Sequence, residues 1–233
     1  MSSLRPSQPL AAGHSAFLFD LDGTLVDNVY EHVLAWREAL SVIGGELPAY
    51  QVHRGIGMSG GLLSAELLRA TGQALSDAQI ERLQDLHTEA FTRLQDRLRP
   101  LPGARELLAF LSDARVPWAI ATSGRRENAQ PALDLLDVPD HVPIVSREQA
   151  AHAKPDPDLF LAASESLGVA LSDAFIVGDS VWDLLAARRA GALGIGLLSG
   201  GIAADELQRA CPYRVYKDPA DLLRHIDQVG VRA

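Results

Sequence analysis

The stretch Phe17-Leu-Phe-Asp-Leu-Asp-Gly-Thr-Leu-Val-Asp27 decides the fold of this chain. Its apolar beginning is typical of a buried strand, and it leads directly into two carboxylates, Asp20 and Asp22, and a Gly-Thr turn. Open α/β sheets bind their ligands at the carboxyl ends of the strands, where these two carboxylates would lie. A helix N-cap or an Asx turn would also explain the pair, because Asp serves in both. The rest of the chain has to distinguish a site from a turn.

Composition and charge restrict the classes of protein to consider. The chain has 233 residues, of which 47% are hydrophobic, and a formal net charge of −9. With no run of Lys or Arg, this charge argues against a nucleic-acid or anionic-membrane surface. Cys211 is the only cysteine, which excludes an intrachain disulfide and is typical of a reducing cytosol. Residues 1–14 contain no long apolar run. We therefore expect a loosely ordered tail without a secretory signal or membrane span, and a cytoplasmic protein.

Short apolar runs alternate with amphipathic helical patterns along most of the chain. The runs that predict strands are 16–19, 118–122, 142–145, 174–178, 193–198 and 214–216. The patterns that predict helices between them are 104–111, 128–136, 157–167 and 184–190. Alternation of this kind predicts βαβ units, and therefore an α/β fold with a parallel sheet.

The interval between Asp27 and Arg99 does not follow this alternation of strands and helices. It contains three helix-like stretches, 29–43, 62–70 and 77–98, and no convincing strand. A crossover between parallel strands needs only about a dozen residues, so this interval is far longer than a connection requires. We predict an inserted all-helical cap domain at residues 28–98, and a core formed by residues 1–27 and 99–233. The hinges would lie at 27–29 and 98–102.

Three later segments place polar groups near the edge where the strands end. Thr122-Ser123-Gly124 follows a predicted strand and offers hydroxyl groups and a turn whose amides can face an anion. Lys154 stands before a proline that can begin a helix. Asp179 and Asp183 follow another strand and lie four residues apart on one helical face. Each segment also has an ordinary explanation when it is taken alone: the first as a turn, the second as a solvated lysine and the third as a helix cap.

Together, these segments form an ordered set of four motifs. They are D-x-D-G-T at 20–24, the apolar run into Thr122, Lys154-Pro155, and G-D-S-x-x-D at 178–183. This order resembles the haloacid dehalogenase superfamily of phosphatases and phosphomutases, over essentially the whole chain. The helical insertion after the first motif resembles the subfamily with a helical cap there. The resemblance implies a Rossmann-like core, a cap that closes over the substrate, Mg²⁺ as cofactor and a small phosphate ester as the substrate.

The resemblance also implies roles for the acidic residues. Asp20 would attack phosphorus, form an aspartyl-phosphate intermediate and ligate Mg²⁺, and Asp179 would be a further metal ligand. Asp22 would protonate the leaving oxygen and then activate water, while its main-chain carbonyl ligates the metal. Asp183, which contacts a water on the metal or orients the phosphate-binding lysine, and Thr24 would support this site from outside.

The remaining candidates would contact the substrate. Thr122, Ser123 and Lys154 would hold the oxygens of the transferring phosphoryl group. His32 lies twelve residues after Asp20, a spacing similar to the cap entry of β-phosphoglucomutases, although a surface histidine in a helix would look the same. Arg54 stands in a glycine-rich segment and could bind a distal carboxylate or phosphate.

Several activities are compatible with these motifs. The acid at position 22 disfavours haloacid dehalogenases proper and phosphonatases, which resemble this chain but lack it. We expect a Mg²⁺-dependent phosphatase of a small metabolite, resembling phosphoglycolate and sugar-phosphate phosphatases. A β-phosphoglucomutase-like mutase is the alternative, which Met58 weakens because mutases carry a basic residue near that position. A non-catalytic binding protein is a lower alternative. The sequence does not indicate the oligomeric state.

Overall fold

The computed structural model describes residues 16–152 and 154–231. The tail expected at residues 1–14 lies outside this part of the chain. Among the helices in the described ranges, none is both long enough and apolar enough to cross a membrane.

The centre of the molecule is a six-stranded parallel sheet, as the alternating pattern predicts. Its strands run in the order β5-β4-β1-β6-β7-β8. They are β1 (Ala16–Phe19), β4 (Trp118–Ala121), β5 (Ile144–Val145), β6 (Ala174–Gly178), β7 (Leu193–Leu197) and β8 (Arg214–Tyr216). Each corresponds to one of the six predicted runs. The α/β fold with a Rossmann-like parallel sheet is therefore confirmed.

Helices cover both faces of the sheet, because alternate side chains of its strands point in opposite directions. Phe17 and Phe19 of β1 pack with the apolar residues of one face, and Leu18 packs with those of the other. The first face is covered by α5 (Ala104–Asp113), α6 (Arg126–Asp134) and α10 (Pro219–Arg224), and the second by α7 (Asp158–Leu167) and α8 (Val181–Ala190). The short helix α9 (Ala204–Arg209) follows β7.

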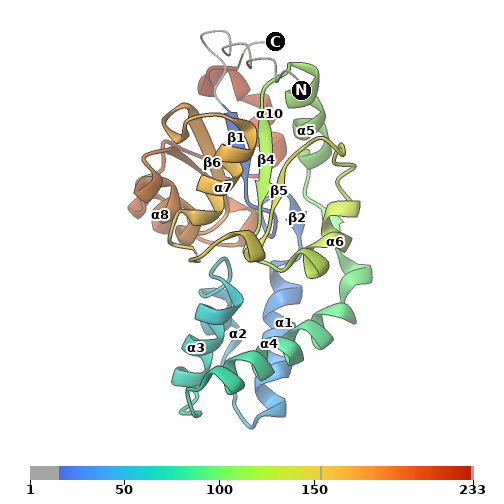
Figure 1. Cartoon of the computed structure of the whole chain (residues 1–233), viewed down its shortest axis with the longest axis vertical. Coiled ribbons are helices and arrows are strands. Elements are labelled where there is room, and N and C mark those ends of the chain that lie inside the picture. Colours follow the sequence, from blue (N-terminus) through green and yellow to red (C-terminus); the bar gives the residue numbers. More distant parts are fainter. Residues whose placement is uncertain (1–15, 153, 232–233) are drawn as a thin grey trace, which may run out of the picture.

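Residues 28–98, here called the helical insertion, follow the first motif. The insertion contains α1 (Val29–Val42), α2 (Ala49–His53), α3 (Gly60–Ala70) and α4 (Asp77–Thr92). It occupies the lower half of the molecule in Figure 1, with the sheet and its helices above. Trp36, Leu40, Leu68 and Leu83 belong to an apolar cluster of its own. The insertion thus buries a separate small core.

The ends of the insertion differ from the sequence expectation. Strand β2 (Val26–Asp27) pairs antiparallel with β3 (Arg99–Pro100), so the chain enters and leaves the insertion through one two-stranded ribbon. The helix expected over 77–98 ends at Thr92, because the chain must unwind to reach β3. Helix α2 was not expected, since five residues are too few to display a helical period.

The register of the sheet brings the motifs together. Phe19 at the end of β1 is paired with Ile120 of β4 on one side and with Val177 of β6 on the other. Asp20, which follows Phe19, therefore emerges between the ends of β4 and β6. The connection from β1 leads to β4 on one side and the connection from β6 leads to β7 on the other, so the strand order reverses here, which is where open α/β sheets form their ligand sites.

Candidate active site

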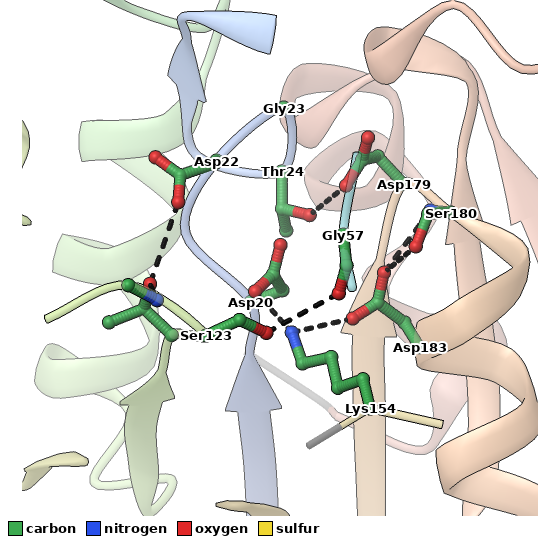
Figure 2. A network of polar contacts seen from close by, with 12 residues as sticks. Asp20, Asp22, Gly23, Thr24, Gly57, Ser123, Lys154, Asp179, Ser180 and Asp183 are labelled. Atoms are coloured by element: carbon green, nitrogen blue, oxygen red, sulfur yellow. Dashed lines mark hydrogen bonds and ion pairs between the residues drawn. The ribbon is translucent and has the colours of Figure 1, made fainter. Parts of the chain in front are cut away.

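Three carboxylates gather at the ends of β1 and β6. One oxygen atom from each of Asp20, Asp179 and Asp183 lies within 4.8 Å of the others. All three side chains are buried, with Asp183 fully inaccessible to solvent. Thr24 donates a hydrogen bond from its hydroxyl to Oδ1 of Asp179 at 3.1 Å, and Figure 2 shows these groups facing one another. The first and last acidic motifs therefore form one cluster.

Lys154 supplies an ammonium group to this cluster of carboxylates. Its side chain is fully buried, and its Nζ forms ion pairs with Asp20 and, at 2.8 Å, with Oδ1 of Asp183. Asp183 is held in turn by Ser180, whose hydroxyl donates to Oδ2 at 2.6 Å. The expected link between Asp183 and Lys154 is therefore present. Burying the lysine without these partners would cost several kcal/mol, on the order of the desolvation penalty of one ion.

The charges in the cluster are not balanced. Burial raises the pKa of Asp20 to about 7, and the charges of Asp183 and Asp22 add to this effect, while Lys154 opposes it. Burial and the charges of Asp183 and Asp20 also raise the pKa of Asp179 well above its ordinary value. Burial alone would lower the pKa of Lys154, but the charges of Asp183 and Asp20 outweigh it and raise the pKa. If all three carboxylates were ionised, they would therefore carry more negative charge than one ammonium group balances.

This donor set fits a hard divalent cation. Mg²⁺ prefers carboxylate and carbonyl oxygens, and the cluster supplies carboxylates without thiols or imidazoles. Backbone also approaches Asp179 closely: a Cβ at Gly23, whose φ is +74°, would lie 2.5 Å from its Oδ2. Only glycine allows the chain to turn so near this carboxylate. Two of the three residues predicted to hold a metal, Asp20 and Asp179, therefore lie together, and Asp183 joins them.

Asp22 points away from this cluster, as Figure 2 shows. Its Oδ1 accepts a hydrogen bond from Nδ2 of Asn28 at 2.5 Å and lies 3.5 Å from Nε2 of His32. Its Oδ2 accepts from the hydroxyl of Thr122 at 3.5 Å. Burial would raise the pKa of Asp22, but the hydrogen bond and charge of His32 and the hydrogen bond from Asn28 outweigh it, so the pKa is lowered. The two carboxylates of the first motif thus occupy different environments.

Residues after β4 form the adjoining wall. The hydroxyl of Thr122 accepts a hydrogen bond from the amide of Gly124 at 3.0 Å, which fixes the turn predicted there. The hydroxyl of Ser123 donates to the carbonyl of Gly57 at 3.3 Å, so this core turn touches the helical insertion. Thr122 is fully buried beside Asp22, whereas Ser123 lines the open space above it.

A pocket of about 130 Å³ opens over Asp20 and Asp22, between the core and the helical insertion. The insertion contributes apolar and neutral polar side chains to it: Trp36, Ile56, Met58, Leu63, Gln84 and Thr88, with His32 and His87. The core contributes Ser123, Asn128, Arg125 and Arg147. Among the described lining residues, the arginines thus come from the core and none comes from the insertion. His32 lies in the pocket, as its spacing from Asp20 suggests.

Arg54 lies elsewhere. Its side chain is 61% exposed and forms an ion pair with Glu206 at 2.7 Å, and its carbonyl accepts a hydrogen bond from Nε1 of Trp182 at 3.2 Å. The glycine-rich segment around it was expected to be a substrate loop. Gly57 and Met58 do reach the pocket, but Arg54 faces the core surface beside it.

The sequence analysis missed two residues: Asn28, which contacts Asp22, and His87, which contacts His32. Asn28 precedes α1 and would be expected to cap it, yet its side chain does not. Instead it bonds Asp22 and accepts a hydrogen bond from the amide of Gly23 at 3.2 Å. His87 of α4 has Nε2 3.1 Å from Nδ1 of His32. Asn directly after the first motif was an available signal, whereas nothing in the sequence pairs His87 with His32.

Comparison with known proteins agrees with this geometry. Residues 14–191 match the model of the family described as haloacid dehalogenase-like hydrolase. Hexitol phosphatase A of Escherichia coli (strain K12) is 32% identical over 187 residues, which are 75% of this chain and 79% of that protein. Beta-phosphoglucomutase of Bacillus subtilis (strain 168) is 29% identical, over 79% of this chain and 84% of that protein.

A solved structure extends the similarity to the arrangement in space. The crystal structure of a hydrolase from Pseudomonas syringae superimposes with a TM-score of 0.90 and 47% sequence identity. It covers 93% of this chain and 100% of that chain. The family match spans the first motif and the last, with the insertion between them. With its motifs assembled at one sheet edge, the chain belongs to the haloacid dehalogenase-like hydrolases.

Proposed function

We propose that this protein is a Mg²⁺-dependent phosphatase that hydrolyses a small phosphate monoester through a covalent intermediate on Asp20. As a member of this hydrolase family with relatives named phosphatases, the chain is a phosphoric monoester hydrolase. The observation that carries the finer proposal is the separation of two carboxylates within one pocket. Asp20 sits with Lys154, Asp179 and Asp183, while Asp22 stands apart with proton-bearing partners.

The metal would be held by the carboxylates of Asp20 and Asp179 and the main-chain carbonyl of Asp22. When bound, Mg²⁺ supplies positive charge that lets an anionic nucleophile approach an anionic phosphate. Lys154 supplies further positive charge beside Asp20, and Asp183 holds Lys154 in place. Thr24 fixes the orientation of Asp179 through its hydroxyl group.

Asp20 and Asp22 would divide the chemistry. An oxygen of Asp20 attacks phosphorus and the ester P–O bond breaks, with its electron pair going to the leaving oxygen. Asp22 gives that oxygen a proton, and in the second step it takes a proton from the water that attacks the acyl phosphate. Asp22 must begin protonated, and the approach of a phosphate dianion raises the pKa of a nearby carboxyl group. Thr122 and Ser123 would hold the phosphoryl oxygens.

The helical insertion would act as a cap domain. It is joined to the core by the β2–β3 ribbon, and it closes the pocket from the side opposite the sheet. Its contacts with the core include His53 Nε2 to the carbonyl of Gly200 at 2.7 Å and Ser123 to the carbonyl of Gly57. Opening at the ribbon would admit substrate, and closure would exclude water before attack on phosphorus.

The pocket wall formed by the insertion favours an uncharged leaving group. The described pocket residues of the insertion include no arginine or lysine, and Met58 and Gln84 occupy the wall that a second anionic group would meet. On that wall, the second phosphate of a bisphosphate, as a mutase requires, or the carboxylate of phosphoglycolate would meet no cation, because Arg125 and Arg147 lie on the core side of the pocket. A phosphorylated sugar or sugar alcohol could donate and accept hydrogen bonds with Gln84, Thr88 and Asn128. We therefore favour a sugar or polyol phosphatase over a phosphoglycolate phosphatase and over a mutase.

The test is phosphate release from hexose and hexitol phosphates and from phosphoglycolate, with Mg²⁺ or with EDTA. Asp20→Asn serves as the blank because it keeps the size of the side chain and removes the nucleophile. We expect Mg²⁺-dependent release that disappears in the variant, with higher kcat/KM for the neutral sugar esters. Preference for phosphoglycolate would refute the assignment of the leaving group. Release that is equal in Asp20→Asn would refute the mechanism.

A further inference from the structure

We propose that His87 is a positioning residue for the acid–base carboxylate, acting through His32. In this inference, which rests on the proposed function, His87 holds the imidazole of His32 in one orientation and one tautomer. His32 in turn presents an N–H group to Asp22. The sequence motifs assign no role to His87, which lies on α4, far along the chain from the first motif.

The three side chains form a line of polar contacts from the insertion to the core. Nε2 of His87 lies 3.1 Å from Nδ1 of His32, and Nε2 of His32 lies 3.5 Å from Oδ1 of Asp22. An ionised carboxylate only accepts hydrogen bonds, so Nε2 of His32 must carry the hydrogen that faces it. The Nδ1 atom of a neutral His32 is then an acceptor, and Nε2 of His87 must donate to it. When His32 is neutral, the direction of both hydrogen bonds therefore follows from the carboxylate of Asp22.

Stacking alone does not define this arrangement. The ring of His32 lies on Phe91 with centroids 4.0 Å apart, and the ring of His87 lies on Trp36 at 4.0 Å. These contacts fix the ring planes, but a half-turn of the His32 ring about its Cβ–Cγ bond would preserve the stack. That half-turn would put carbon atoms where Nδ1 and Nε2 now stand. The hydrogen bond from His87 is the contact that distinguishes the two orientations.

His87 is suited to remain a neutral donor. Burial alone holds the pKa of His87 below its ordinary value, and a charge on His32 would lower it further, although Asp22 opposes both; His87 is therefore neutral in either protonation state of His32. A neutral imidazole has one N–H group, and the contact with His32 accounts for it. A purely structural histidine in the aromatic stack would need no such alignment of its nitrogen atom.

The consequence for catalysis depends on the leaving group. An alkoxide is strongly basic, so its departure requires the proton that Asp22 supplies. A nitrophenolate is a stable anion and leaves without one. Misplacement of Asp22 should therefore slow alkyl phosphates much more than aryl phosphates. A variant that only disturbs the fold or the closure of the insertion should slow both equally.

The experiment compares kcat for glycerol 1-phosphate, an alkyl ester, and 4-nitrophenyl phosphate in His87→Phe and His87→Gln. Phenylalanine keeps a ring on Trp36 but has no N–H group, whereas the glutamine amide can place a donor near the position of Nε2. We expect His87→Phe to lower kcat for the alkyl ester by about 10- to 100-fold, the usual cost of losing such an outer contact. The loss for the aryl ester should stay below about threefold, and His87→Gln should recover most of the activity.

Two controls separate the possible outcomes. Leu86→Ala, beside His87 in α4, removes apolar packing in the insertion and should leave the ratio of the two kcat values unchanged. At a pH where His32 is neutral, ¹⁵N NMR of His32 should show the Nε2–H tautomer in the wild type and in His87→Gln, and a mixture in His87→Phe. Equal losses for both esters, or an unchanged tautomer in His87→Phe, would overturn the inference. If wild-type activity survives in Asp20→Asn, the proposed function itself fails.

Discussion

Replacement of Lys154 by methionine should destabilise the metal-free protein strongly, although a buried charge is removed. The chain has two lysines, and Lys154 is fully buried while Lys217 is exposed. Methionine has a similar length, so the loss of packing is small. The change leaves Asp20, Asp179 and Asp183 together without their ammonium group, and three buried carboxylates repel one another.

The size of the effect has a lower and an upper bound. Removing one partner of a buried ion pair commonly costs about 3–5 kcal/mol. The repulsion can also be relieved if Asp20 takes up a proton. In the folded protein its pKa is already about 7, so at pH 7 this protonation costs less than about 1 kcal/mol and moves the loss toward the lower end of that range. We therefore expect a loss of about 3–4 kcal/mol. For a chain of this size, this loss lowers Tm by roughly 6–16 °C.

Urea unfolding in EDTA at pH 7, followed by circular dichroism, measures this loss directly. Lys217→Met is the matched control, and as a surface change it should alter the free energy of unfolding by less than about 0.5 kcal/mol. Equal unfolding midpoints for Lys154→Met and Lys217→Met would refute the reasoning. That result would mean that Lys154 does not compensate the carboxylates in the folded protein.

Three further outcomes are expected. The pKa of Asp20 is raised to about 7, so the folded state holds more protons than the unfolded state between pH ~4 and ~7. In EDTA, the stability of the wild type relative to Asp20→Asn should therefore fall as pH rises through this window, and a constant difference in urea unfolding would contradict it. Asp179→Asn should raise the Mg²⁺ concentration for half-maximal phosphate release by about tenfold or more, because the site loses a charged ligand; an unchanged concentration would exclude Asp179 as a ligand. Arg54→Ala should change KM by less than about twofold and stability by less than about 1 kcal/mol, because Arg54 pairs with Glu206 at the surface; a tenfold rise in KM would place it at the substrate.

The sheet and the core half of the site could be predicted because both follow from local patterns. Each strand of the sheet is a short apolar run, and parallel strands necessarily bring their carboxyl ends to one edge. Asp20, Thr122 and Asp179 each follow such a run, so their proximity did not require knowledge of side-chain packing. Lys154 was found by its motif, and its complete burial could not be read from the sequence.

The pocket wall formed by the insertion was less predictable, since helix packing decides which side chains face the core. A helical period shows that a face is buried, but it does not show against what. Arg54 belongs to the predicted substrate segment, yet its neighbours Gly57 and Met58 reach the pocket while it turns outward to Glu206. His87 meets His32 only because α1 packs along α4, and no local signal records that contact.

The environments of the two carboxylates in the first motif shift their pKa values in opposite directions. In the protein alone, the pKa of Asp20 is raised by burial among like charges, whereas the pKa of Asp22 is lowered by His32 and Asn28. A nucleophile must be ionised and a general acid must be protonated, so each pKa shift runs against the proposed role of its residue. Positive charge placed beside Asp20 lowers its pKa, and a phosphate dianion placed beside Asp22 raises its pKa. Both changes in pKa would come from groups that the site binds, the cation and the substrate. The catalytic protonation states of Asp20 and Asp22 would therefore be favoured together when cation and substrate occupy the pocket.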